Sequence, residues 1–410
     1  MNADGRGGVG ERIAFHRKKL GLSQVEFAAK VDRSESWVSQ VERGVRPVDR
    51  LSVLQTVANV LGVSTAELRG TRDETPVEEP AERPEAYEEL RLALTGHPAL
   101  SHLFGTDTSG NPPDTEQLSA RHEGIWAMLH DSRYSELAPA LAELIPALEH
   151  ASRAGDTEAD QVRARRLLSD TYQVTAAMLA RTSENDAAWV AADRAAFVAE
   201  RLDEPLVVAA GLFRMAHVFL SLRQLRQAQW VAETASRALE PPAGDDVDVR
   251  VLSLYGAFQL VLSVVAAQEN ERTQARERLA KAQHVAERIG EDRNDFGTEF
   301  GPTNVAVHAV SIAVDLGDAG TALERAGQVD ITGLSPERQA RFLVDIARAQ
   351  AMRRQIGDAL RSLERAEQIA PEQARDLKTA REVARDLVQL AGARTQPELR
   401  DLAERLDALT

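Results

Sequence analysis

The sequence predicts an all-α protein, and three observations support that prediction. Hydrophobic residues make up 43% of the 410 residues but aromatic residues only 4%, so Ala, Leu and Val dominate the apolar content, as is typical of helices rather than sheets. From Tyr87 onward, apolar residues recur at helical spacing. Near the start of the chain, Ser23 and Glu26 have the spacing of a helix capping box.

The chain is long enough for two or three domains at roughly 150 residues each. It has no cysteine, which excludes disulfides, thiolate metal sites and cysteine nucleophiles and fits a reducing cytosol. No basic region followed by an apolar one opens the chain, so we expect a cytoplasmic protein. Residues 251–268 are uncharged, but Ser253, Tyr255 and Gln259 interrupt them, and we expect a buried helix and no membrane partner.

Charge is divided unevenly along the chain. Residues 1–70 contain 11 Lys and Arg against 8 Asp and Glu, a net of +3, and the total of -15 leaves -18 for the remainder. Because the DNA backbone is anionic, a contact with nucleic acid is expected in the first 70 residues.

Breaks in the helical pattern divide the chain into six expected segments. These are a flexible tail (1–8), a helical module (9–70), an acidic, proline-rich linker (71–86), connecting helices (87–157), helical repeats (158–371) and C-terminal capping or dimerisation helices (372–410).

Five short helices are expected within residues 9–70. The capping box at Ser23 predicts a helix from Gln24, and Ser34 is placed to cap the next one, which Gly44 ends. Two short helices joined by a tight turn form a helix-turn-helix. A second capping box, Ser64 to Glu67, opens the last helix.

The run from Leu20 to Gly44 resembles the DNA-binding domain of the lambda Cro and repressor family, over about 60 of the 410 residues. The resemblance implies that Gln24 contacts phosphate, that Glu35, Ser36 and Gln40 face base edges, and that Arg17 and Glu42 form an internal salt bridge. The chain departs from the family pattern at Asp32, where glycine usually makes the turn, and at Trp37, where a small polar residue is common.

The chemistry of these residue types agrees with that implication. A Gln40 amide pairs with adenine in the major groove, and arginines near the recognition helix neutralise phosphates. Trp37 either packs on a thymine methyl or sugar, or closes the edge of the core. The expected DNA-binding residues are Gln24, Arg33, Glu35, Ser36, Trp37, Ser39, Gln40, Arg43 and Arg46. Since one small module binds weakly, we expect a homodimer on a palindromic double-stranded operator.

Residues 158–371 contain a repeat. Small or apolar residues twelve apart mark five helix pairs, at Ala176/Ala188, Ala216/Ala228, Ser263/Ala275, Val310/Ala322 and Ala347/Ala359. The region resembles a tetratricopeptide-like α-solenoid, although only the second and fifth pairs match that pattern well; a non-repeating helical bundle is the alternative. The expected architecture is therefore an all-α chain, with a five-helix lambda-repressor-like domain followed by this solenoid.

A solenoid presents a concave surface suited to an extended peptide or a partner helix. Counting along the repeats places a set of polar side chains there as candidate ligand contacts: Gln173, His217, Gln268, Asn304, Ser311, Arg341 and Arg348. Residues 296–302, with Phe296 and Phe300 among glycines, form either a lid or a plug between repeats.

Together these features resemble the peptide-sensing regulators of Gram-positive bacteria, which implies a DNA-binding transcriptional regulator with a peptide or small-molecule effector. The alternative is an interaction scaffold whose repeats bind a protein partner. An enzyme is not expected, because no catalytic or phosphate-binding motif is present, and neither a cofactor nor a metal is expected.

Overall fold

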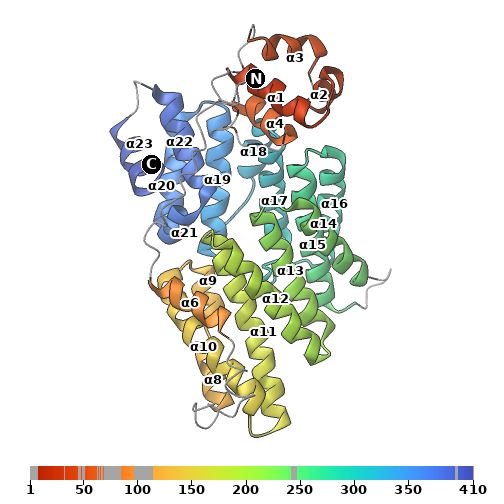
Figure 1. Cartoon of the computed structure of the whole chain (residues 1–410), viewed down its shortest axis with the longest axis vertical. Helices are drawn as coiled ribbons and strands as arrows, with labels where there is room; N and C mark the ends of the chain where they lie inside the picture. Colours follow the sequence, from red (N-terminus) through yellow and green to blue (C-terminus); the bar gives the residue numbers. More distant parts are fainter. Residues whose placement is uncertain are drawn as a thin grey trace.

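The computed structural model describes residues 8–31, 33–44, 48, 51–61, 63, 65, 68, 85–96, 114–241, 247–392 and 396–409. Within these residues every regular element is helical, as the composition predicts. Figure 1 shows a small N-terminal group of helices seated at one end of a larger helical array. The expected tail and linker, as well as Asp32 and Arg46, lie outside the described residues apart from their margins.

The N-terminal domain contains α1 (Val9–Lys19), α2 (Gln24–Lys30), α3 (Glu35–Glu42) and α4 (Leu51–Leu61). Both reciprocal bonds of the predicted capping box are present: the Ser23 hydroxyl accepts from the Glu26 amide, and the Glu26 carboxylate accepts from the Ser23 amide. Ser34 caps α3 as predicted. Gly10 allows α1 to cross α3 closely, because a Cβ there would lie 1.9 Å from the carbonyl oxygen of Val41. Ser64 and Glu67 of the second predicted capping box lie outside the described residues, and Leu68 is helical.

Within the described residues, four helices lie between the N-terminal domain and the repeats, namely α6 (Glu85–Thr95), α8 (Thr115–His122), α9 (Ile125–His130) and α10 (Tyr134–Ala154). Their apolar faces share one core with the first repeat helices, including Leu90, Leu141 and Leu179. These helices therefore extend the array at its N-terminal end.

The repeats are five antiparallel helix pairs. They are α11 (Glu158–Arg181) with α12 (Asn185–Ala199), α13 (Pro205–Ser221) with α14 (Leu225–Ala238), α15 (Val249–Gln268) with α16 (Arg272–Ile289), α17 (Pro302–Asp315) with α18 (Ala319–Ala326), and α19 (Pro336–Met352) with α20 (Ile356–Ile369). All ten residues predicted to mark the pairs are 0% exposed, because each lies where the two helices of a pair approach closely. In the third pair the Ser263 hydroxyl also donates to the carbonyl of Ala275 at 2.7 Å.

Helix α15 is long and apolar enough to cross a membrane by length and composition, but 72% of its most apolar window is buried inside the protein. It serves as the core helix of the third pair, against residues such as Phe213 and Phe300. The expectation of a buried helix for this stretch is therefore met.

The array curves until its two ends touch. Ser132, before α10, donates to Gln373 at 2.8 Å, and Ser135 donates to Glu372 at 2.8 Å. These acceptors lie in α21 (Pro371–Asp376), which α22 (Lys378–Ala391) and α23 (Pro397–Arg405) follow. First helices of distant pairs consequently turn their polar sides toward one another across the inside of the curve.

Candidate nucleic-acid interface and inner repeat face

Helix α3 lies on the side of the N-terminal domain away from the repeats (Figure 1). Val38 and Val41 anchor its inner side in the domain core. Its outer side carries the polar residues predicted to meet DNA: Glu35 and Ser36 are exposed, while Ser39 and Gln40 are half-buried. Gln40 donates to the Ser36 hydroxyl at 3.4 Å, so the two side chains lie together on the exposed surface of α3.

A buried ion pair fixes the angle between α1 and α3. Arg17 Nε lies 2.5 Å and Arg17 Nη2 2.9 Å from the two carboxylate oxygens of Glu42. A third Arg17 nitrogen donates to the carbonyl of Leu22 at 2.6 Å. The salt bridge implied by the family resemblance is confirmed. Gln24 also donates to Glu42, at 2.7 Å, which holds this predicted phosphate contact at the start of α2.

Two cationic side chains flank the exposed surface of α3. Arg43, at its C-terminal end, is exposed and donates to the carbonyl of Ser39 at 3.1 Å. Arg33, in the turn before α3, lies over Trp37 with its guanidinium carbon 5.9 Å from the ring centroid. The Trp37 ring is half-buried against the core, in agreement with the prediction that it closes the edge of the core. Its remaining surface faces outward beside Arg33.

Two capped helices at a tight turn, with an anchored second helix and a polar outer surface between arginines, define a helix-turn-helix DNA-binding domain. A family model described as a helix-turn-helix domain matches residues 9–70. The chain is 31% identical over 120 residues to the immunity repressor protein of Bacillus phage phi105, covering 28% of this chain and 81% of that protein. The chain belongs to the helix-turn-helix transcriptional regulators of the Cro and repressor type.

Further relatives agree with this assignment. The regulator SinR of Bacillus licheniformis is 36% identical over 67 residues, which cover 16% of this chain and only 60% of SinR. An uncharacterised helix-turn-helix regulator, y4dJ, of Sinorhizobium fredii is 38% identical over 68 residues, which cover 17% of this chain and 87% of that protein. Each of these matches spans well under half of this chain.

One solved structure resembles the whole chain weakly. This is PlcR of Bacillus thuringiensis in complex with the peptide PapR7 and DNA, with a TM-score of 0.31 and 11% identity over 89% of this chain and 96% of that one. The similarity is too low to transfer any residue or ligand to this chain.

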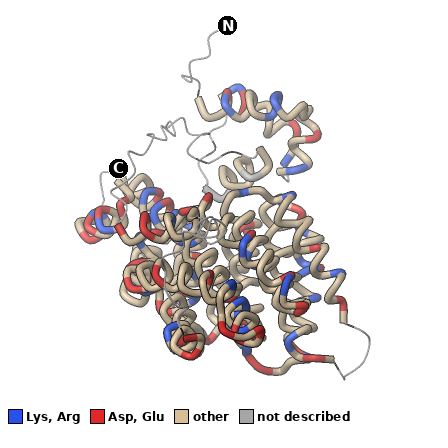
Figure 2. Tube along the Cα trace, turned by 60° about the horizontal axis from the view of Figure 1, so that its bottom comes forward, with Lys and Arg blue, Asp and Glu red and all other residues tan. Residues whose placement is uncertain are grey.

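We call the polar surface inside the curve the inner face. It is formed by side chains of α11, α13, α17 and α19, with α9 and the loop before α17 at its edge, and consists of His130, Arg181, Arg214, His217, Glu299, Asn304, His308, Ser311, Asp315, Glu337, Arg338, Arg341, Asp345 and Arg348. Figure 2 shows charges of both signs along the repeat helices.

Ion pairs cross the inner face between helices far apart in the sequence. Arg181 of α11 donates to Glu337 of α19 at 2.9 Å. Arg338 donates to Glu299 at 2.7 Å and to the side-chain oxygen of Asn304 at 2.8 Å. The inner face is thus a connected network that spans the curve.

Burial and neighbouring arginines determine the protonation states of His217, His308 and Glu337 on the inner face. Burial and nearby Arg338 lower the pKa of His308 to about 4. The pKa of His217 falls well below its usual value because the ring is buried beside Arg214, Arg338 and Arg341. Burial opposes ionisation of Glu337, but Arg181 and Arg341 outweigh it and lower its pKa to about 2. Both imidazoles are therefore neutral at pH 7 while Glu337 is ionised.

Some of the predicted ligand contacts are buried or already paired within the protein, and others remain partly accessible. Gln173 and Asn304 are each only 2% exposed, and Asn304 is held by Arg338, so its amide is less open than the sequence suggests. Arg348 pairs with Asp315 at 3.0 Å and with Asp345 at 3.2 Å. Gln268, at the end of α15, and His217 and Ser311 are half-buried.

Arg341 is the most open of the predicted ligand contacts. Its side chain is 49% exposed, and its ion pair with Glu337 is long, at 3.7 Å. Sequence reasoning missed Arg338 and Glu337 as the centre of the network, because the sequence does not show which residues of distant helices face a given charged side chain.

The loop at residues 296–302 is a plug rather than a lid. Phe300 is fully buried against α15, where the hydrogens of Gly256 leave room for its ring: a Cβ at Gly256 would lie 2.1 Å from the Phe300 Cζ atom. Arg214 secures the same loop by donating to the carbonyls of Phe296 and Gly297 at 2.7 and 2.9 Å. The plug thereby ties α13, α15 and the inner face together.

Proposed function

We propose that this transcriptional regulator binds a palindromic operator as a homodimer, with α3 in the major groove of each half-site. The observation that supports this most directly is the row of polar residues Glu35, Ser36, Ser39 and Gln40, exposed or half-buried, on a helix whose other side is anchored in the core. A single such domain makes few base contacts, and paired half-sites about one helical turn apart supply the missing affinity.

In this proposal Gln40 reads an adenine through its amide, while Ser36 and Ser39 contact base edges or sugars. Arg33, Arg43 and Arg46 neutralise phosphates, and Gln24, positioned by Glu42, donates to another phosphate. Glu35 accepts from a cytosine amine where the helix enters deeply enough. Trp37 contributes the outer part of its ring to the sugar backbone.

The repeats sense the signal in this proposal, through the inner face. His217 and His308 supply neutral hydrogen-bonding groups, while Arg341 offers a half-exposed cation. A carboxylate fits this set, because a guanidinium pairs with it through two parallel hydrogen bonds. The effector is accordingly a peptide, bound through its C-terminus or an acidic side chain, or a small carboxylic acid. In this proposal the regulator itself acts in the cytoplasm and has no enzymatic activity.

The experiment for DNA binding is genome-wide occupancy of the tagged protein, compared with a Gln40→Ala, Arg43→Ala double variant. Sharp peaks that share a palindrome and vanish in the variant are expected. Peaks that persist in the folded variant would contradict the role of α3, and sedimentation showing a monomer with undiminished operator affinity would contradict the dimer.

The experiment for sensing compares thermal stability and operator affinity with and without a pool of short synthetic peptides carrying free C-termini. A shift that disappears in Arg341→Gln but survives in Arg361→Gln, an exposed arginine of α20, is expected. No shift, or a shift equal in both variants, would contradict the inner face as the sensor.

A further inference from the structure

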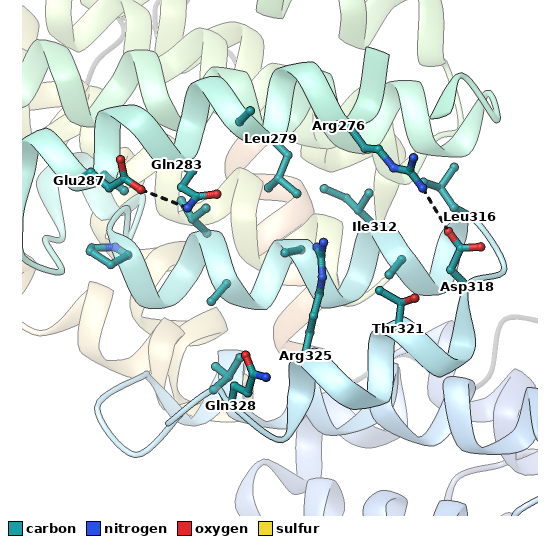
Figure 3. Close-up of a pocket in the computed structure, with 18 residues that line it drawn as sticks. Arg276, Leu279, Gln283, Glu287, Ile312, Leu316, Asp318, Thr321, Arg325 and Gln328 are labelled. Carbon is teal, nitrogen blue, oxygen red and sulfur yellow. Dashed lines mark hydrogen bonds and ion pairs between the residues drawn. The ribbon is translucent and has the colours of Figure 1, made fainter. Parts of the chain in front are cut away.

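The fourth repeat leaves part of the array uncovered on its outer side. Its second helix, α18, has 8 residues, whereas α16 of the preceding pair has 18. Between α16 and α18, along one side of α17, the structure forms a groove of about 650 Å³ (Figure 3). We call it the outer groove.

Apolar side chains line the floor and one wall of the outer groove. The floor is α17, with Val305, Ala309 and Ile312 among its residues, and Leu279 of α16 forms part of the wall. The small side chains of Ala306, Ala309 and Ala313 on α17 also line the groove. The volume lies within the range of about 300 to 1,000 Å³ that small-molecule sites have.

Charged side chains around the outer groove are satisfied, with one exception. Asp318 accepts from Arg272 at 2.7 Å and lies 3.8 Å from Arg276, which bridges one end of the groove (Figure 3). Glu287 accepts from Gln283 at 3.1 Å. Arg325 extends from α18 across the groove in Figure 3, and no described residue pairs with its guanidinium.

We propose that the outer groove binds an amphipathic carboxylate, with its aliphatic chain along α17 and its carboxylate on Arg325. The floor from Val305 to Leu316 is about 17 Å long at the helical rise per residue, and the Arg276–Asp318 ion pair limits it at one end. A short aliphatic chain fits this length. A guanidinium beside an apolar trough selects an anion over a neutral or cationic analogue.

The outer groove is separate from the inner face. Asn304, His308, Ser311 and Asp315 occupy one side of α17, and the groove residues Val305, Ala309 and Ile312 occupy an adjacent side, about 100° around the helix axis. This proposal consequently does not depend on the effector assigned to the inner face, and the two are tested by different variants.

The test is calorimetric titration of the full-length protein with decanoate, with decanamide as the uncharged analogue of equal length. One site is expected, with affinity about tenfold weaker for decanamide, since a hydrogen bond to a charged group contributes about 1.5 kcal/mol. Arg325→Gln should weaken decanoate to the same degree and leave decanamide unchanged. Ala309→Trp, which fills the floor, should abolish both.

Arg361→Gln, an exposed arginine of α20 that belongs to neither surface, is the matched control and should bind decanoate as the wild type does. Circular dichroism and the melting temperature confirm that each variant is folded, and Arg325→Gln changes only an exposed side chain. Equal affinities for decanoate and decanamide, undiminished binding in Arg325→Gln, loss of binding in Arg361→Gln, or absence of binding at millimolar decanoate would each overturn the proposal.

Discussion

The side-chain amide of Asn270 donates to the backbone carbonyl of Lys30 at 2.9 Å, and so joins the third repeat to the DNA-binding domain. Asn270 lies in the turn between α15 and α16 with a left-handed φ of 62°, a conformation that asparagine tolerates better than most residues. Lys30 is the last residue of α2, directly before the turn of the helix-turn-helix. Helix α4 also contacts α19.

Asn270→Ala should loosen this junction without unfolding either part. One hydrogen bond contributes about 1 kcal/mol, so the detached fraction should rise by up to about fivefold. Because the chain has no cysteine, dyes on Lys19→Cys and Thr234→Cys allow a single-molecule energy-transfer measurement. Thr273→Ala, three residues away, should leave the distribution unchanged, and an unaltered distribution in Asn270→Ala would mean that other contacts set the domain position.

Glu42→Ala should destabilise the DNA-binding domain by about 3 kcal/mol, because it leaves the buried Arg17 guanidinium and the Gln24 amide without their shared acceptor. Urea unfolding, followed through a fluorine label on Trp37, reports this domain alone. The double variant Arg17→Met, Glu42→Leu should recover part of the loss. Glu35→Ala, an exposed neighbour, should change stability by less than about 0.5 kcal/mol.

Gln40→Ala and Arg43→Ala should affect DNA binding differently. Removing an arginine that contacts phosphate weakens binding to all sequences and lowers the slope of log affinity against log salt by about 1. Removing a base-reading amide reduces discrimination by about 1 to 3 kcal/mol at one base pair and leaves the salt slope unchanged. Titrations at several salt concentrations on operator variants distinguish these outcomes, and identical changes in the two variants would contradict the assigned roles.

Asp376→Asn should stabilise the protein above pH 6. Burial, with Glu372 nearby, raises the pKa of Asp376 to about 6, so its contribution to stability is present below its unfolded value of 3.8 and is lost as the pH rises through 6. The gain from the amide should therefore grow between pH 4 and 7, reach about 3 kcal/mol, and stay constant above. Thermal unfolding across this range, with the exposed Asp358→Asn as control, measures it.

Gly256→Ala should destabilise the third pair by at least about 1 to 3 kcal/mol, since the new methyl group overlaps the Phe300 ring. Phe300→Leu in the same chain should restore part of the loss. The matched control is Gly320→Ala in α18, where the nearest atom lies 3.6 Å from the added Cβ, and it should be neutral or stabilising by up to about 1 kcal/mol. Equal denaturation midpoints for the two glycine variants would rule out the plug as a structural contact.

Local patterns in the sequence predicted much of the fold. The caps at Ser23 and Ser34 form as expected because a cap depends on residues only three apart. The twelve-residue spacing of small residues located all five helix pairs, since a close helix crossing requires a small side chain whatever the surrounding loops do. The Arg17–Glu42 pair followed from the family resemblance.

The inner face and the outer groove were not predictable in the same way. Arg181 and Glu337 meet only because the array curves through several pairs, and the angle between pairs is set by packing that no spacing encodes. Helix α18 ends at Ala326, before Gly327, a position where the helical pattern predicted no break. Asn304 and Arg348 were placed on the correct helices, but their partners were unknown, so their availability to a ligand was overestimated.

Helix α17 is a partition one helix thick, with a polar side that meets the inner face and an apolar side that floors the outer groove. A ligand that binds on one side of α17 and stabilises one position of the helix also changes the affinity for a ligand on the other side. Thermodynamic linkage makes the effect mutual: the factor by which an inner occupant changes outer affinity equals the factor in the opposite direction. Two ligands bound on different sides of one helix can in this way be combined into a single response at the operator.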